Sequence, residues 1–267
     1  MKNFNESTHN EIAVCFVGNY RYLRKHYKNI SNELKLVAKY HGDILLITSF
    51  FTPTFLIKSI RREKRLTIFR FRKIKFSKNA SKIMSSLYTD NQPNRFLTKR
   101  FQWHKLHLFD LKIKKWKYIF YLDLNMHFHH EINEILSVKP SNILYARADA
   151  YPNYDRKLIS QFDQTHNLFK NLQEEFNLNS VQYFQTGILY FDTEIIKYDT
   201  KKNLVELVEK YPISITNEQG IMNLYFSNIK NQYKELSKKT GNKITYFYWM
   251  LENKETIITK QLRTQYK

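Results

Sequence analysis

The amino-terminal part of the chain alternates continuous apolar runs with a segment of helical periodicity. The runs from Ile12 to Val17 and from Asp43 to Thr48 contain almost no polar residue. Such runs are typical of strands buried on both faces, as in parallel sheets covered by helices. Between them, apolar residues from Tyr20 to Tyr40 recur at spacings of three and four, which predicts an amphipathic helix with a break and a cap near Ser31. This order predicts a right-handed strand, helix, strand unit.

Further strands are predicted later in the chain, and two of them end in an acid. One runs from Lys117 to Leu122 and leads into Asp123, and the other runs from Gly187 to Phe191 and leads into Asp192. The segment from Leu66 to Lys75 alternates weakly and predicts an exposed strand.

The length and composition favour one large domain. The 267 residues include five Gly and five Pro, and no internal repeat or Gly-, Pro- or Ser-rich linker divides them. A folded chain of this size buries roughly three quarters of the surface that its unfolded form exposes. We therefore expect a single α/β, Rossmann-like domain over residues 1–267, with a mostly parallel central sheet flanked by helices.

The charge of the chain is strongly positive and unevenly distributed. It carries 44 Lys and Arg against 24 Asp and Glu, a net charge of +20, and the segment from Lys58 to Lys117 holds most of the excess. Such a segment predicts an anionic partner, and nucleic acid, an acidic membrane face and a phosphorylated small molecule all have the required charge. Composition does not choose among them.

The cysteine content and the apolar runs predict a cytoplasmic protein. Cys15 is the only cysteine, so we expect a buried, reduced thiol without a disulfide. The residues from Met1 to Glu11 lack the pattern of a secretory signal. The apolar stretch from Ile44 to Ile57 is interrupted by polar residues and is shorter than the ~20 residues that span a bilayer. Peripheral contact with a membrane is compatible with these features.

Asp123 is the acid with the most informative position. An acid at the carboxyl end of a strand lies in the crevice where parallel α/β sheets bind ligands. Asp123 and Asn125 together can supply oxygen ligands to a divalent cation, which would bridge phosphate oxygens. If the chain stays extended, His127 lies on the same face and adds a nitrogen ligand. Turn formation or helix capping by Asp123 is the alternative interpretation.

Three other segments surround this strand in the sequence in a recognisable order. They run from Phe101 to Phe109, from Tyr183 to Asp192 and from Thr216 to Asn223. With the strand before Asp123, they resemble the glycogenin-like glycosyltransferases of family eight, over about Ala13 to Phe226. The resemblance implies a GT-A fold, a nucleotide-sugar donor such as a UDP-sugar, and a divalent cation, Mn²⁺ or else Mg²⁺. It divides the domain into a donor-nucleotide half, about 11–125, and an acceptor and sugar half, about 126–267.

The resemblance also implies roles for individual residues. Val17, Asn19 and Tyr22 match the donor-nucleotide loop, where the aromatic ring stacks on uracil. Lys105 matches a lysine that faces the donor phosphates and sugar. The remaining assignments place Asp123, Leu124 and Asn125 at the metal-binding Asp-x-Asp motif, Asp149 at an acid that touches the donor sugar, Gln185 at the reaction centre, and Glu218 and Gln219 at the family's Asp-Gln-Gly motif.

The sequence departs from the family pattern at the metal site. Asn125 replaces the second aspartate, and the segment from Ile244 to Trp249 lacks the histidine that the family places near its carboxyl end. Both departures put dependence on a metal in doubt.

The favoured hypothesis is transfer of a sugar to a hydroxyl of a glycan or protein acceptor, with metal assistance and retention of anomeric configuration. One alternative is a degenerate relative that binds a nucleotide sugar or glycan without turning it over. A second alternative, a nucleic-acid-binding module, is less favoured because no such motif accompanies the basic segment. The excess charge from Lys58 to Lys75 exceeds the need of one donor and predicts an anionic acceptor or membrane surface. The oligomeric state is open.

Overall fold

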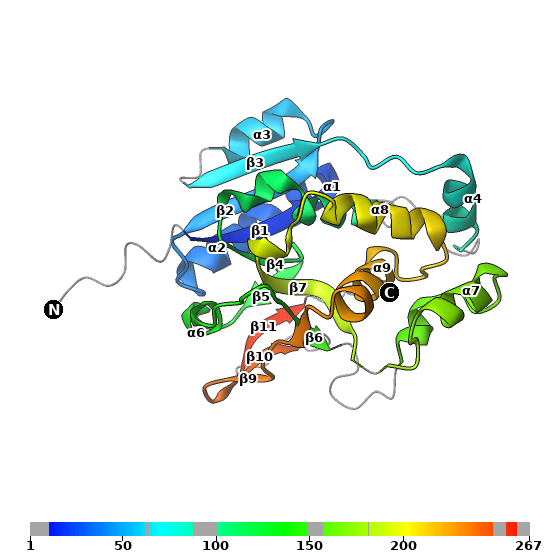
Figure 1. Cartoon of the computed structure of the whole chain (residues 1–267). Coiled ribbons are helices and arrows are strands. Elements are labelled where there is room, and N and C mark those ends of the chain that lie inside the picture. Colours follow the sequence, from blue (N-terminus) through cyan, green and yellow to red (C-terminus); the bar gives the residue numbers. More distant parts are fainter. Residues whose placement is uncertain are drawn as a thin grey trace, which may run out of the picture.

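The computed structural model describes residues 11–61, 65–87, 101–148, 157–180, 182–247 and 255–260. A seven-stranded sheet with the order β3-β2-β1-β4-β7-β6-β8 forms its centre (Figure 1). A smaller, four-stranded sheet has the order β5-β11-β10-β9. The central sheet takes strands from both predicted halves of the domain. That residues 1–267 form one domain with a donor-nucleotide half and an acceptor half stays a prediction.

The first half of the central sheet is parallel, as predicted. β1 (Ile12–Gly18) lies between β2 (Asp43–Ser49) and β4 (Tyr118–Leu122), and β3 (Leu66–Phe71) forms the edge. All residues of β1 and β4 are buried, which explains their continuous apolar sequences. The carboxyl ends of these strands therefore meet at one edge of the sheet.

The second half of the sheet contains antiparallel pairs. β7 (Phe184–Asp192) runs antiparallel to both β4 and β6 (Leu144–Ala148), and β8 (Tyr233–Glu235) is parallel to β6. Because β7 runs against β4, the start of β7 lies beside the end of β4. This reversal brings the Gln185 and Thr186 segment to the edge at which Asp123 follows β4.

Helices and the second sheet cover the two faces of the central sheet. Alternate residues of β1 point to opposite cores: Ala13 and Cys15 to one, Val14 and Phe16 to the other. The first core packs against the 3-10 helix η2 (Trp103–Phe109), α8 (Thr200–Lys210) and α9 (Glu218–Asn223). The second core packs against α2 (Lys28–Leu36), α6 (Asn133–Ser137) and the small sheet.

The helical segment after β1 is irregular at a different place from the one predicted. Asn19 caps α1 (Tyr20–Tyr22), which continues into the π-helical turn η1 (Leu23–Tyr27) and then into α2. Ser31 is buried within α2 rather than at its start, so the predicted break and cap at Ser31 are wrong. The irregularity lies one turn earlier and keeps Leu23 and Tyr27 in the core.

The small sheet lies beside the end of β4. Its strands are β5 (Met126–Phe128), β11 (Thr256–Lys260), β10 (Lys243–Phe247) and β9 (Lys239–Thr240), with β11 antiparallel to β5.

No helix in the described ranges has the length and apolar character needed to cross a membrane. The remaining elements are α3 (Thr54–Ile60), α4 (Lys78–Ser86), η3 (Leu111–Lys115), η4 (Leu158–Gln161), α7 (Leu168–Glu175), η5 (Thr193–Ile195) and η6 (Leu224–Ile229).

Candidate active site

The candidate site lies where β4 ends and the chain turns into β5. The Asp123 backbone N–H donates to the Gly187 carbonyl on β7, at 2.9 Å, and the Asp123 carbonyl accepts from the Met126 N–H, at 3.2 Å. The first bond holds Asp123 at the edge of the central sheet, and the second closes the turn that follows Asp123. Asp123 therefore lies at the edge formed by the carboxyl ends of the parallel strands, as predicted.

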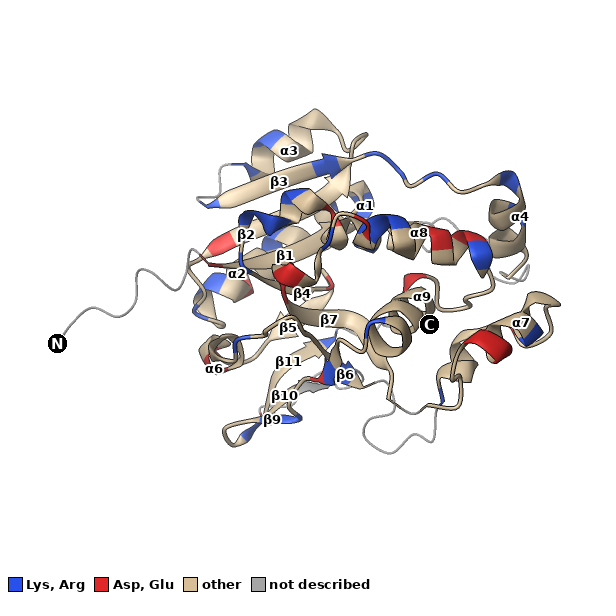
Figure 2. Cartoon of the chain, in the orientation of Figure 1, with Lys and Arg blue, Asp and Glu red and all other residues tan. Residues whose placement is uncertain are grey.

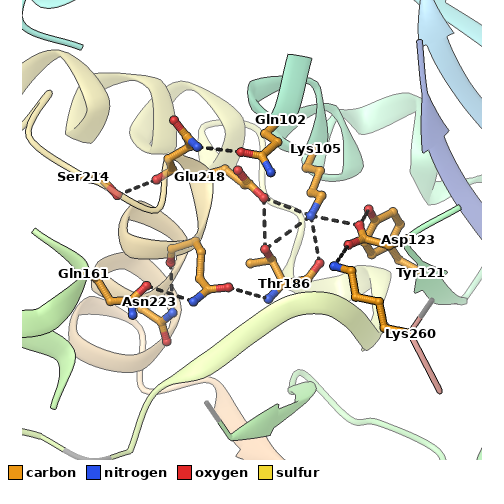
Figure 3. A network of polar contacts seen from close by, with 12 residues as sticks. Gln102, Lys105, Tyr121, Asp123, Gln161, Thr186, Ser214, Glu218, Asn223 and Lys260 are labelled. Atoms are coloured by element: carbon orange, nitrogen blue, oxygen red, sulfur yellow. Dashed lines mark hydrogen bonds and ion pairs between the residues drawn. The ribbon is translucent and has the colours of Figure 1, made fainter. Parts of the chain in front are cut away.

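Lys105 is the centre of the charged network at this edge (Figure 3). Its Nζ lies 3.0 Å from Asp123 Oδ1 and 3.0 Å from Glu218 Oε1. The same Nζ donates to the Thr186 carbonyl at 3.2 Å. Every residue of η2, the helix that carries Lys105, is buried. The short helix is thus fixed by packing on both sides, and its lysine is presented to the sheet edge with little freedom.

The charges of this network stabilise one another. Burial alone would lower the pKa of Lys105, but the neighbouring carboxylates of Asp123 and Glu218 outweigh burial and raise it. Burial would raise the pKa of Asp123, but Lys105, Lys260 and the hydroxyl of Tyr121 hold it well below its usual range. Tyr121 donates to Asp123 Oδ1 at 2.6 Å. Lys105 and Asp123 are therefore both charged at neutral pH.

Glu218 is held at the start of α9 by a strained turn. Asn217, before it, has a φ of 56°, in the left-handed region that non-glycine residues seldom adopt. The Asn217 side-chain amide donates to Gln102 Oε1 at 2.6 Å, and the Asn217 backbone carbonyl accepts from Ser214 Oγ at 2.7 Å. Backbone strain of this kind is often found at functional sites. The turn places the Glu218 carboxylate, 2% exposed, against Lys105.

The start of β7 is joined to α9 by side-chain contacts. The Thr186 hydroxyl donates to Glu218 Oε1 at 3.0 Å, and the Thr186 N–H donates to Gln219 Oε1 at 3.2 Å. Gln219 Nε2 in turn donates to Gln161 Oε1 at 2.9 Å. These contacts bring the predicted residues Glu218 and Gln219 next to the β7 segment that contains Gln185.

Among the buried oxygens that have no hydrogen-bond partner in the described part of the chain, two belong to predicted site residues. They are Gln185 Oε1 and Glu218 Oε2. A buried acceptor without a partner costs free energy, and such an atom at a functional site is often satisfied by a ligand. Both atoms are therefore candidates to accept hydrogen bonds from a bound molecule.

The predicted nucleotide loop lies beside the turn at Asp123. Val17 is buried at the end of β1, and the Asn19 side chain accepts from the Tyr22 N–H at 2.9 Å. A Cβ on Gly18 would lie 2.2 Å from Leu124 Cδ1, so the two loops are in close contact and a larger residue here would require Leu124 to shift. The Leu124 side chain packs in the core, and its backbone is the part that lies at the turn. The roles of Asn19 and Tyr22 in binding the donor nucleotide stay predictions.

The chain does not stay extended after Asp123, so the condition under which His127 would join Asp123 and Asn125 as a metal ligand is not met. The chain turns at residues 124 and 125, so the period of two along the strand is interrupted. His127 Nδ1 lies 2.9 Å from Glu33 Oε1, on the side of α2. Asn125 remains half-buried next to Asp123. Asp149 lies outside the described residues.

Lys260 is a member of the network that the sequence did not reveal. Its Nζ lies 2.9 Å from Asp123 Oδ2, and it comes from β11, which pairs with β5 so that Lys260 is opposite Met126. The two residues of the ion pair are 137 positions apart. No local motif identifies a lone lysine near the carboxyl end, and only the pairing of β11 with β5 brings it to the site.

Among the described residues around Asp123, the donor set of a divalent cation is incomplete. Hard divalent cations take about six oxygen ligands, with carboxylates foremost. Here Lys105 and Lys260 contact one carboxylate oxygen each, and both are cations. No group of three or more His, Cys, Asp or Glu that could hold a metal occurs in the described ranges. The predicted Mn²⁺ or Mg²⁺ site at Asp123 and Asn125 stays a prediction that these contacts do not favour.

Known glycosyltransferase structures have similar folds. GlyE of Streptococcus pneumoniae TIGR4 matches with a TM-score of 0.52 and 16% identity, over 85% of this chain and 46% of GlyE. The galactosyltransferase LgtC, in complex with donor and acceptor sugar analogues, gives a TM-score of 0.60 at 11% identity, over 93% of this chain and 86% of LgtC. The fold is of the GT-A type. The mannosyltransferase Ktr4p of S. cerevisiae, in complex with GDP, gives 0.56 at 10% identity, over 88% and 71% of the two chains.

These likenesses confirm the predicted α/β fold. At such low sequence identity, these similarities show a shared fold and nothing further. This chain spans less than half of the length of GlyE. Comparison with protein-family models found no match, and comparison with curated protein sequences found none either. The predicted glycogenin-like family therefore stays a prediction.

Proposed function

We propose that the protein is a glycosyltransferase that moves a sugar from a nucleoside diphosphate donor to an acceptor hydroxyl. The observation that carries this proposal is the position of Lys105, a buried ammonium held 3.0 Å from both Asp123 and Glu218 at the ligand-binding edge of a GT-A type sheet. A diphosphate leaving group develops negative charge as the glycosidic bond opens, and a preorganised cation stabilises that charge.

The chain's own residues suffice for the main steps of this reaction. The acceptor oxygen forms a bond to the anomeric carbon while the bond from that carbon to the diphosphate oxygen breaks, and the acceptor proton passes to the departing diphosphate. Lys105 stabilises the diphosphate electrostatically. Gln185 Oε1 and Glu218 Oε2, the buried acceptors without partners, bind sugar hydroxyls and orient the ring.

The donor and the stereochemistry follow from the resemblance and are part of the proposal. Asn19 and Tyr22 follow Gly18, which lies against Leu124 at the turn, and stacking of a base on Tyr22 would suit uridine. Asp149 would touch the donor sugar. Retention of configuration and an acceptor hydroxyl on a glycan or protein complete the proposal. A bound divalent cation stays a separate prediction, and no step above depends on it.

The proposal is tested by release of the nucleoside diphosphate. Nucleotide sugars, with UDP-sugars first, are incubated with the protein in the presence and absence of Mn²⁺, and the free diphosphate is measured. Asp123→Ala should lower release by about a hundredfold or more, because it removes the partner of Lys105. The matched control, Asp199→Ala, changes an exposed acid outside the network and should leave release unchanged.

Each alternative function has its own outcome in this assay. Calorimetric binding of a nucleotide sugar with no release or transfer under any condition would identify a degenerate binding protein. Oligonucleotide binding that is tighter than nucleotide-sugar binding and weakens with salt would favour a nucleic-acid-binding module. Release by Asp123→Ala at the wild-type rate would disprove the role of Asp123.

We further propose that an exposed face near the donor loop contacts an anionic lipid surface. This aromatic-basic face consists of Phe50, Phe51, Phe55, Lys58, Arg61, Arg70 and Arg72. Figure 2 shows Lys and Arg on α3, on β3 and along the segment that leads to α4. From the predicted segment between Lys58 and Lys75, the face contains Lys58, Arg61, Arg70 and Arg72; Arg62 and Lys64 lie outside the described residues.

The composition of this face suits a lipid surface better than a small donor. Phe51 and Phe55 are 80% and 67% exposed, and the guanidinium groups of Arg70 and Arg72 lie over the Phe50 ring at 5.4 and 5.6 Å. Exposed aromatic side chains insert at the headgroup boundary, and each Lys or Arg near an anionic bilayer contributes about 1 kcal/mol. The face adjoins the donor loop, since Tyr20 and Phe55 have an edge-to-face contact at 6.2 Å.

Vesicle co-sedimentation tests the lipid proposal. The protein should bind vesicles that contain phosphatidylglycerol and should not bind vesicles of phosphatidylcholine alone. Phe51→Ser and Arg61→Ser should weaken binding about fivefold or more each. Leu36→Ser, at another exposed apolar residue, is the control and should bind like the wild type. Binding to an acidic glycan but to neither vesicle would assign the face to an anionic acceptor instead.

A further inference from the structure

We propose that the ammonium of Lys260 supplies, at Asp123, the positive charge for which a divalent cation was predicted, so that donor binding and transfer need no metal. The inference rests on the proposed function and specifies how the same site binds the donor diphosphate. Its starting observation is the pair of contacts on Asp123, with Lys260 Nζ 2.9 Å from Oδ2 and Lys105 Nζ 3.0 Å from Oδ1.

The two lysines approach Asp123 from two sides (Figure 3). A metal ion on this carboxylate would have to displace at least one ammonium or remain next to two positive charges. The only other carboxylate in the described network is that of Glu218, which lies on the far side of Lys105. Asn125, two positions after Asp123, is uncharged and so adds no second carboxylate at this place. The donor set therefore favours an ammonium over a divalent cation.

Exposure increases from the inner to the outer end of the network. The side chains are exposed by 2% at Glu218, 9% at Lys105, 17% at Asp123 and 18% at Lys260. Lys260 is thus the more exposed of the two cations, and Lys105 is the more buried one. A diphosphate that arrives at this edge meets Lys260 first.

Lys260 is fixed by a strand rather than held on a mobile surface chain. β11 is paired with β5 through Ile258 opposite Phe128 and Lys260 opposite Met126, directly after the turn at Asp123. His129 Nε2 lies 2.8 Å from Thr259 Oγ1, and the His129 N–H donates to the Ile257 carbonyl at 2.9 Å. The ammonium is therefore positioned before the donor arrives, as electrostatic stabilisation of a leaving group requires.

A merely structural role for Lys260 is the rival explanation. In that case the ion pair with Asp123 would tie the small sheet to the central sheet without touching a ligand. Removing the lysine would then lower the melting temperature but would change neither the affinity for a diphosphate nor the response to metal. The two explanations are separated by a binding measurement with metal as a variable.

The experiment uses UDP as the probe and the intact chain. UDP binding is measured by calorimetry in EDTA and in MnCl₂ for the wild type, Lys260→Met, Lys260→Arg and the control Lys243→Met, which changes an exposed lysine of the same small sheet. The wild type should bind equally in both conditions. Lys260→Met should bind about tenfold to a hundredfold more weakly in EDTA, Lys260→Arg should retain most of the affinity, and the control should match the wild type.

The metal response of the methionine variant is the decisive readout. Removal of the ammonium exposes Asp123 Oδ2, so Mn²⁺ should restore part of the UDP affinity in Lys260→Met and in no other variant. Wild-type binding that EDTA abolishes and Mn²⁺ restores would overturn the inference while leaving the proposed function intact. If the wild type binds no UDP and no nucleotide sugar, either in EDTA or in MnCl₂, the proposed function fails and the inference fails with it. Equal affinities of folded Lys260→Met and wild type in EDTA would leave Lys260 a structural role only.

Discussion

The charged network around Lys105 and the aromatic-basic face use the same kinds of side chain in opposite ways. In the network, Lys105 and Lys260 are largely buried, and each lies within about 3 Å of a carboxylate. On the aromatic-basic face, Lys58, Arg61 and Arg72 are exposed, and the segment from Lys58 to Lys75 contains Glu63 as its one acid.

The two regions differ in how far their charged groups are exposed to solvent. A buried ion pair has lost its hydration, so removal of one partner leaves a charge that neither water nor protein satisfies. An exposed cation remains hydrated, contributes little to folding and is available to an anionic surface. Changes in the network should therefore alter stability and chemistry together, whereas changes on the face should alter binding alone. The following predictions test that distinction.

Lys105→Met should have the largest effect. It leaves Asp123 and Glu218 without their shared cation, so the free energy of unfolding should fall by about 3–5 kcal/mol and nucleotide release should be lost. Urea denaturation followed by circular dichroism measures the change. The matched control is Lys114→Met, at an exposed pair with Glu194 of 3.3 Å, where a loss within about 1 kcal/mol is expected. Similar losses in the two variants would contradict the distinction.

Acid pH should weaken the wild type through Asp123. Burial would raise the pKa of Asp123, but Lys105 and Lys260 lower it below the unfolded value of about 3.9. Its contribution is therefore fully present above that unfolded value and is lost as the pH falls towards the lowered folded value. Each unit of difference corresponds to about 1.4 kcal/mol.

Asp123→Asn checks this pH dependence. The asparagine cannot titrate, so the free energy of unfolding should fall less steeply below about pH 4 than in the wild type. Urea midpoints measured at a series of acid pH values provide the comparison. Parallel curves for the two proteins would mean that Asp123 does not carry the lowered pKa.

Gly18→Ala should have a smaller but clear effect on the frame of the network. The new Cβ would lie 2.2 Å from Leu124 Cδ1 and 3.0 Å from Leu23 Cδ2, within a packed core. Overpacking of this kind costs about 1–3 kcal/mol, measured as a fall in the free energy of unfolding. In the double variant Gly18→Ala/Leu124→Ala the loss should be less than the sum of the two single losses. Simple additivity would show that the two loops do not constrain each other.

Arg61→Ser and Arg72→Ser should have the smallest effect on folding. Both side chains are exposed, and exposed substitutions usually change stability by less than about 0.5 kcal/mol. Thermal denaturation should therefore give unchanged melting temperatures, and nucleotide release in the absence of vesicles should equal that of the wild type. A large loss of stability in either variant would mean that the face has a structural role.

Much of the fold was predictable because buried strands leave a direct mark on the sequence. The apolar runs at Ile12 to Val17 and Asp43 to Thr48 became β1 and β2, and Asp123 lies at the predicted end of β4. Cys15 is buried and free, as predicted, and burial raises the pKa of its thiol. The strand predicted from Leu66 to Lys75 corresponds to β3, but β3 ends at Phe71 and is mostly half-buried rather than exposed. In each case, a local pattern reflects a local environment.

Other features were mispredicted or missed because they depend on contacts between distant segments. The helical pattern after β1 was assigned a break at Ser31, whereas the irregularity is the π-helical turn η1, where Leu23 and Tyr27 fill the second core. The turn after Asp123 directs His127 to Glu33 on α2. The partner of Gln219 is Gln161, which no motif includes.

By itself, the sequence determined the parallel half of the sheet and the place of Asp123 at its edge, because periodicity and strand ends are local properties. It also located the excess of positive charge. Only the tertiary structure decided which charges are buried in pairs and which remain exposed. Lys105 meets Glu218 because α9 packs against β7, and Lys260 meets Asp123 because β11 pairs with β5. Electrostatic energies depend on distance and burial, and the fold sets both for residues that are far apart in the chain.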